Sequence, residues 1–120
     1  MILVDTSIWI SHFRDTNSHL TGLLLNELVA CHPFVIGELA CGSMKNLKEI
    51  ISLLEALPQA IAAEHDEILA FIELKKLVGI GIGLIDIHLL ASSLLSNTPL
   101  WTTDKRLQAA AEKLNTFYKK

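Results

Sequence analysis

Short apolar runs alternate with longer amphipathic stretches along the chain, and this alternation predicts its elements. Runs of about three apolar residues predict buried strands at 2–4, 29–31 and 100–102. Two further short strands are expected within 59–63 and at 116–118. Apolar positions spaced three and four residues apart predict the helices. The predicted helices begin at Thr6 and near Ser18, run from Pro33 toward Gly42, follow Asn46 as far as Leu57, and cover 64–78, 84–95 and about 105–114.

The order of these elements predicts the fold class. Strands that alternate with one or two helices favour an α/β fold, in which helices cover both faces of a parallel sheet. No repeat or linker interrupts the pattern, so we expect one domain over residues 1–120. Ligands of such sheets bind at the carboxyl ends of the strands. Asp5 and Asp104 each follow a predicted strand closely, which predicts that both lie near one edge of the sheet.

Composition narrows the class of protein. Of the 120 residues, 51% are hydrophobic and 19% charged, which excludes a disordered chain. The formal net charge of −3 excludes a basic nucleic-acid coat protein but not an enzyme that acts on nucleic acid. The most apolar stretch, 80–95, contains Asp86 and His88, and the amino terminus carries no basic leader. We therefore expect no membrane segment and a cytoplasmic protein, with Cys31 and Cys41 as reduced thiols.

Four acidic residues occur in apolar surroundings. They are Asp5 in MILVD, Glu38 in PFVIGELACG, Asp86 in GLIDIHLLA and Asp104 in PLWTTD. A carboxylate removed from water costs several kcal/mol unless a partner compensates, and these runs contain no lysine or arginine. A shared cation would compensate all four, and oxygen ligands suit Mg²⁺ or Mn²⁺.

Each of these acids also has a simpler interpretation. Asp5 and Asp104 could cap the helices that begin at the next residue, and Asp86 could cap its own helix or pair with His88. Glu38 could point into solvent from its helix. Capping does not explain Glu38, so the joint pattern favours the shared site more than any one member does.

Four motifs make the sequence similar to the PIN-domain ribonucleases, specifically to the VapC-type toxins of bacterial toxin–antitoxin pairs. The motifs are LVDTS, IGELACG, GLIDIHLLA and LWTTDKRL, which occur in the family's order and span residues 4–107. Leu107 departs from the family pattern, because many relatives carry phenylalanine there. This difference concerns packing rather than chemistry.

The resemblance implies a PIN-like three-layer α/β/α sandwich with a short central parallel sheet, and an endoribonuclease that uses one or two Mg²⁺ or Mn²⁺ ions. A metal-activated water would cleave the RNA phosphodiester bond. Asp5, Glu38 and Asp86 would be the principal metal ligands, with Asp104 completing the set directly or through water. Thr6 and Thr102 would orient these groups from outside the ligand set. The implied partners are RNA, a cognate antitoxin protein and a second copy of the chain in a homodimer.

Basic residues near these motifs are candidates for contact with RNA phosphates. Two follow the Glu38 helix and two follow Asp104; they are Lys45, Lys48, Lys105 and Arg106. Without the four acids of the candidate site, the net charge of the remaining chain is −3 + 4 = +1. An acidic isoelectric point is therefore compatible with an RNA substrate once the site holds its cations.

Three other functions are alternatives to the nuclease. A catalytically silent PIN-like binding module would have the same motifs, so only an assay separates it from the enzyme. A receiver-type signalling domain would need an aspartate after a central strand, and none occurs between Asp15 and Asp66. The GIGIG sequence at 79–83 lacks the full dinucleotide-binding fingerprint and is expected to be a flexible loop before Asp86.

Overall fold

A three-stranded parallel sheet lies at the centre of the computed structural model, which describes residues 1–120. The strands are β1 (Ile2–Val4), β2 (Val29–Ala30) and β3 (Leu100–Trp101), in the order β2–β1–β3. The central strand β1 pairs in parallel with both neighbours. The α/β class with a short parallel sheet, predicted from the sequence, is confirmed.

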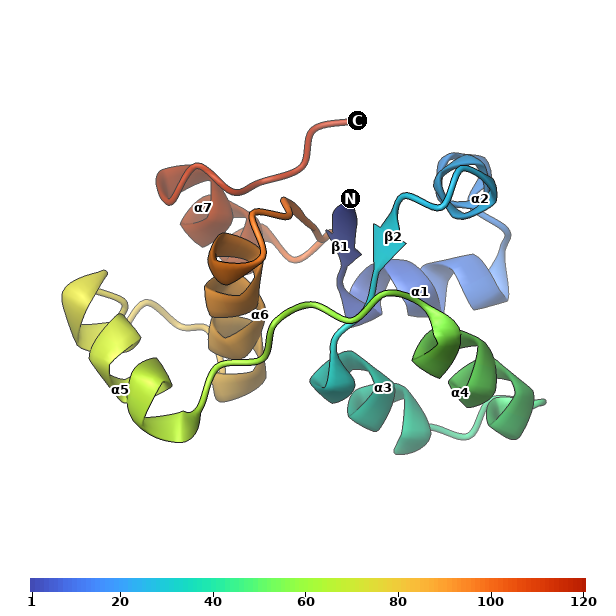
Figure 1. Ribbon diagram of the computed structural model, residues 1–120, viewed down its shortest axis with the longest axis horizontal. Helices are drawn as coiled ribbons and strands as arrows, with labels where there is room; N and C mark the ends of the chain where they lie inside the picture. Colours follow the sequence, from blue (N-terminus) through green and yellow to red (C-terminus); the bar gives the residue numbers. More distant parts are fainter.

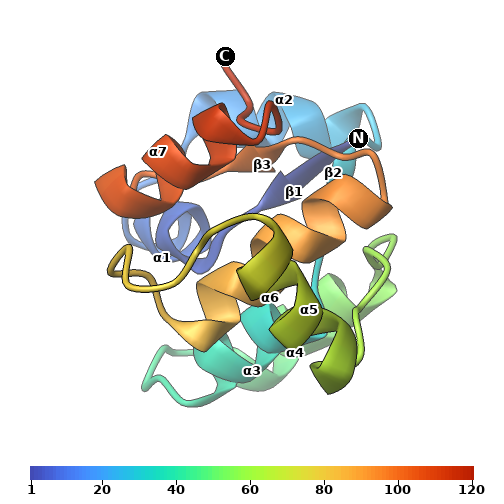
Figure 2. The same cartoon turned by 90° about the vertical axis from the view of Figure 1, so that its left-hand side faces the viewer.

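Seven helices surround the sheet. Helices α5, α6 and α7 lie on one side of it, and α1 to α4 lie on the other (Figure 1), which gives the expected three layers. Figure 2 views the molecule from the side of α5, α6 and α7, with α6 crossing in front of the strands. The helices are α1 (Thr6–Arg14), α2 (Ser18–Leu25), α3 (Pro33–Ala40), α4 (Leu47–Ala56), α5 (His65–Leu74), α6 (Leu84–Leu95) and α7 (Lys105–Lys113).

Several predicted boundaries differ from the structure. The brief strands expected at 59–63 and 116–118 are single bridges, from Gln59 to Cys31 and from Phe117 to Leu100. Helix α5 ends at Leu74 rather than 78, because Lys76 adopts a left-handed backbone conformation with φ of 57°. Its start is set by a capping box, in which Glu64 and Glu67 each accept a hydrogen bond from the other's backbone N–H.

The core consists of one cluster of buried apolar side chains. Leu3 and Val4 of β1 and Leu100 of β3 are fully buried, and they pack in the same cluster as Leu89 and Leu90 of α6. The middle of α6 is buried from 87 to 93, as the apolar sequence of this helix predicts. This packing fixes the position of the first turn of α6 relative to the ends of β1 and β3. No helix has both the length and the hydropathy needed to cross a bilayer.

Candidate metal centre

Asp5 lies at the carboxyl end of the central strand and is almost completely buried. Its side chain makes no hydrogen bond to the backbone of α1, so the capping interpretation of Asp5 is wrong. Two hydroxyl groups, Ser7 Oγ and Thr102 Oγ1, donate to Asp5 Oδ2, each at 2.7 Å. Because both donate to the same oxygen, Oδ1 is left for another partner. The Thr102 contact also joins the end of β1 to the segment that follows β3.

Glu38 reaches the same edge of the sheet from α3. The Thr6 hydroxyl, in the first turn of α1, donates to Glu38 Oε1 at 2.7 Å. Helix α3 begins at Pro33, and its N-cap is His32, whose Nδ1 accepts a hydrogen bond from the Phe34 N–H at 2.9 Å. Glu38 is exposed, as expected if it pointed into solvent from its helix. Its carboxylate is nevertheless held by Thr6, the residue next to Asp5.

Asp86 lies in the first turn of α6, within electrostatic range of the other three acids. The pKa of Asp86 is raised to about 6, chiefly by burial and in addition by the negative charges of Asp5, Asp104 and Glu38. The helix is capped at Gly83 rather than at Asp86. Four acids from four separate segments of the chain therefore share one electrostatic environment.

Asp104 has two roles in the structure. It caps α7, because its Oδ1 accepts a hydrogen bond from the Leu107 N–H at 2.9 Å, as its simpler interpretation expected. Its own N–H donates to Thr102 Oγ1 at 3.0 Å, so the same threonine orients both Asp5 and Asp104. The charge of Asp104 also acts on Asp86. Capping occupies one carboxylate oxygen and leaves the second for a ligand.

The donor set fits a hard divalent cation. All four donors are carboxylates, and no lysine or arginine contributes to the pKa of Asp86. No three histidine, cysteine, aspartate or glutamate side chains are drawn together into a ready-made ligand cluster. The charges of Asp5, Asp104 and Glu38 raise the pKa of Asp86, and a bound cation would neutralise this repulsion.

Ser7 is a site residue that was not singled out from the sequence. Its hydroxyl contacts Asp5, lies 3.4 Å from Thr102 Oγ1 and accepts the Thr103 N–H at 3.3 Å. The signal was present, because Ser7 completes the LVDTS motif and lies two residues after Asp5 at the start of a helix. A serine at this place is positioned to donate to the preceding aspartate.

Two histidines are buried behind the acids without joining them. His88 packs against Phe34, with ring centroids 4.5 Å apart, and its centroid is 6.4 Å from that of His32. Burial lowers the pKa of His88, and it lowers the pKa of His32 to about 4. Both rings are therefore neutral at pH 7 and add no positive charge to the site, so the expected alternative of an Asp86–His88 pair receives no support.

The four candidate RNA contacts lie in two places. Lys105 and Arg106 open α7 directly after Asp104, and both are exposed. Lys45 precedes α4, and Lys48 lies in its first turn. Lys105 and Arg106 therefore follow one of the four acids directly, in the first turn of the helix that this acid caps.

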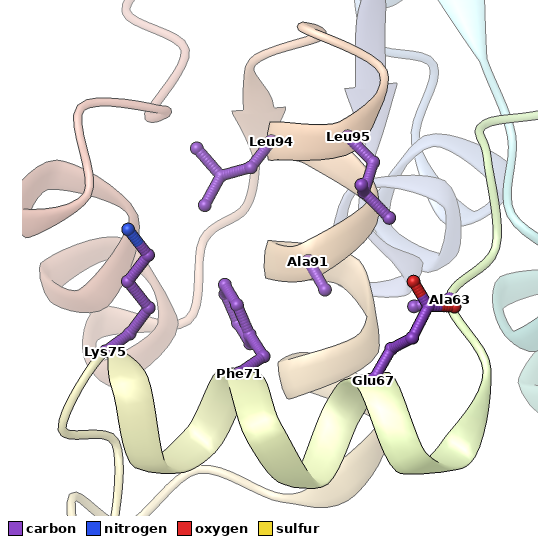
Figure 3. Close-up of a pocket in the computed structure, with 7 residues that line it drawn as sticks. All are labelled: Ala63, Glu67, Phe71, Lys75, Ala91, Leu94 and Leu95. Carbon is purple, nitrogen blue, oxygen red and sulfur yellow. The ribbon is translucent and has the colours of Figure 1, made fainter.

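One hollow of the molecule has none of the four acids in its lining. It lies between α5 and α6, measures about 340 Å³ and is lined mainly by apolar side chains, including Phe71 and Leu94 (Figure 3). Lys75 and Glu67 contribute its polar rim.

The chain belongs to the PIN-domain family, since the family model of the PIN domain matches residues 2–113. The VapC type within it, predicted from the four motifs, is also confirmed. The chain is 46% identical to Ribonuclease VapC32 of Mycobacterium tuberculosis, in both strain CDC 1551 / Oshkosh and strain H37Rv, over 92% of this chain and 90% of the relative. Among solved structures, the crystal structure of PAE2754 from Pyrobaculum aerophilum is similar in fold, with a TM-score of 0.61 and 17% identity over 94% of this chain and 85% of that one.

Proposed function

We propose that this protein is a Mg²⁺- or Mn²⁺-dependent endoribonuclease and the toxin of a type II toxin–antitoxin pair. The observation that carries the proposal is the convergence of four acids on one edge of the sheet, where three of them act on the pKa of Asp86. The 46% identity to a ribonuclease over most of the chain supports RNA as the substrate. The PIN fold makes the receiver-type alternative untenable.

Asp5, Glu38 and Asp86 would hold the cation, and Asp104 would complete the site with the oxygen that does not cap α7. When bound, the divalent ion supplies Lewis acidity, which lowers the pKa of water and balances negative charge that develops on the phosphate. The hydroxyls of Ser7, Thr102 and Thr6 keep Asp5 and Glu38 in fixed orientations. They also stabilise the ionised form of the carboxylates that accept these hydrogen bonds.

Exposed apolar side chains favour the binding of protein partners, and we expect an antitoxin and a second copy of the chain. A hollow of about 240 Å³ between α1, α2 and α4 is lined by Trp9, Phe13 and Leu54 among others, with Leu53 exposed beside it. Leu74 and Val78 are each about three-quarters exposed near the end of α5. Apolar side chains left in water at this density are typical of surfaces that a partner covers. Light scattering of the purified protein measures whether it is a dimer.

The purified protein should cleave RNA with Mg²⁺ or Mn²⁺ and lose this activity when a chelator removes the metal. Asp5→Asn should lower cleavage by roughly a hundredfold or more, because it removes a charged ligand from the catalytic ion. Asp15→Asn is the matched control, since Asp15 is exposed at the end of α1 and touches no member of the site. Circular dichroism checks that both variants are folded. Equal cleavage by Asp5→Asn and wild type would show that the proposed site is wrong, whereas no cleavage with any divalent metal would leave the silent binding module as the better interpretation.

A further inference from the structure

A second polar feature lies beside the acidic edge and is basic. Three cationic side chains, Lys76, Arg106 and Lys113, surround a hollow of about 230 Å³ between α7 and the segment that follows α5. We refer to it as the basic pocket. Its remaining lining is apolar and includes Leu77 and Ile80, and no acidic residue lines it. Three of the chain's ten basic residues thus gather at one hollow in a protein whose net charge is negative.

Arg106 is held in place at this pocket. Its Nη1 donates to the Gly81 carbonyl oxygen at 3.3 Å, across the loop that leads to α6. Gly81 has a φ of 84°, and a Cβ atom there would lie 2.5 Å from Arg106 Nη1. The missing side chain therefore lets the guanidinium lie against the loop. One of its five N–H donors is used by this contact, and the others can bind an anion.

The position of the basic pocket relates it to the four acids. Arg106 lies two residues beyond Asp104 in the first turn of α7, and Lys113 is the last residue of that helix. At 1.5 Å per residue, the pocket extends roughly 10 Å along α7 away from Asp104. Its opposite wall is the segment before Gly81, which continues into the first turn of α6 and Asp86. A strand that is bound at Asp104 and follows α7 would therefore pass this pocket next.

We infer that the basic pocket binds one nucleotide of single-stranded RNA that flanks the cleaved bond, an inference that rests on the proposed function. The three cations match the phosphate, and the apolar floor of Leu77, Ile80 and the α7 alanines matches the face of a sugar and base. A free phosphate would not need the apolar floor. Lys76 and Lys113 thereby join Arg106 as contacts that raise the affinity for RNA without taking part in bond cleavage.

The test compares two double variants that carry the same change in net charge. Lys76→Gln/Lys113→Gln removes two cations from the basic pocket. Lys75→Gln/Lys119→Gln is the control, because Lys75 lines the hollow between α5 and α6 and Lys119 lies near Glu112 and Phe117. Binding of a fluorescent single-stranded RNA is measured by anisotropy in a chelator, with no cleavage, at several salt concentrations. Cleavage by the metal-loaded protein is measured separately.

The pocket variant should bind RNA roughly tenfold more weakly than the wild type, and the control less than twofold more weakly. The slope of log K against log salt should fall by up to about 0.7 in the pocket variant, since one neutralised phosphate on a single strand contributes about 0.7. Its KM should rise in cleavage assays while kcat stays near the wild-type value. Equal losses in the two double variants would show a general charge effect and overturn the inference. Because binding is measured without metal, this result is independent of whether the wild type cleaves RNA.

Discussion

Asp86→Asn should strongly lower RNA cleavage and also make the metal-free protein more stable. The pKa of Asp86 in the folded protein, about 6, lies some two units above its ordinary value of 3.8. Each unit corresponds to about 1.4 kcal/mol, so at pH 7 the ionised side chain costs the folded state about 1 to 3 kcal/mol. Asparagine removes this charge with little change in shape. Urea unfolding in a chelator should show the gain, and RNA cleavage should fall by roughly a hundredfold or more.

Asp66→Asn is the matched control for this prediction. Asp66 also lies in the first turn of a helix, α5, but its side chain is exposed and it is not one of the four acids of the site. A negative charge at a helix N-terminus is mildly favourable, so Asp66→Asn should leave stability unchanged or slightly lower and keep cleavage intact. A loss of stability in Asp86→Asn, or cleavage at the wild-type rate, would contradict the placement of Asp86 among three other acids.

Cleavage at limiting Mn²⁺ should weaken steeply as the pH falls below about 6. The raised pKa of Asp86 means that this ligand gains a proton near pH 6, and a protonated carboxyl does not bind the ion well. One proton competing with one metal ion lowers the apparent metal affinity about tenfold per pH unit on the acid side. The dependence should disappear at saturating Mn²⁺, because the metal then displaces the proton. Initial rates at pH 7, 6 and 5, each at two metal concentrations, measure it.

The stability of the fold over this range must be followed alongside. His32 has a folded pKa of about 4, below its ordinary value of 6.5, so its neutral form contributes stability that is present above pH 6.5 and lost as the pH falls toward 4. Asp86 acts in the opposite direction, since its protonation relieves repulsion between about pH 6 and 4. Thermal unfolding at pH 5 and pH 7 shows how far the two contributions offset each other.

A pH profile of the cleavage rate that is the same at both Mn²⁺ concentrations would contradict the role of Asp86 as a metal ligand.

The sequence predicted those elements whose ends carry clear local signals. The strand β1 and the helix α6 agree with the structure because a polar residue or a glycine loop bounds each apolar run. The end of α5 was predicted four residues too late, because the apolar pattern continues to Val78 while Lys76 turns the backbone into the left-handed region. Propensity gives little warning of such a conformation in a lysine.

The four acids were recognisable from the sequence because each is an unpaired charge in an apolar run. The hydrogen bonds that orient them were not recognisable, since the Thr6–Glu38 bond joins residues 32 positions apart and the Thr102–Asp5 bond joins residues 97 apart. The basic pocket was also hidden, because Lys76 and Lys113 are brought together only by the packing of α7 against the segment after α5. Lone lysines at the ends of two helices look like ordinary solvated charges in the sequence.

Binding of Mn²⁺ tests most directly whether Asp5, Glu38, Asp86 and Asp104 form one cation site. Electron paramagnetic resonance of free Mn²⁺ can be recorded while wild-type protein is added at pH 7, and again with the Asp5→Asn/Asp86→Asn variant. The signal of free Mn²⁺ should fall to a stoichiometry of one or two ions per wild-type chain, and the double variant should leave it nearly unchanged. Equal loss of the signal with both proteins, or none with the wild type, would contradict a metal centre built from these acids.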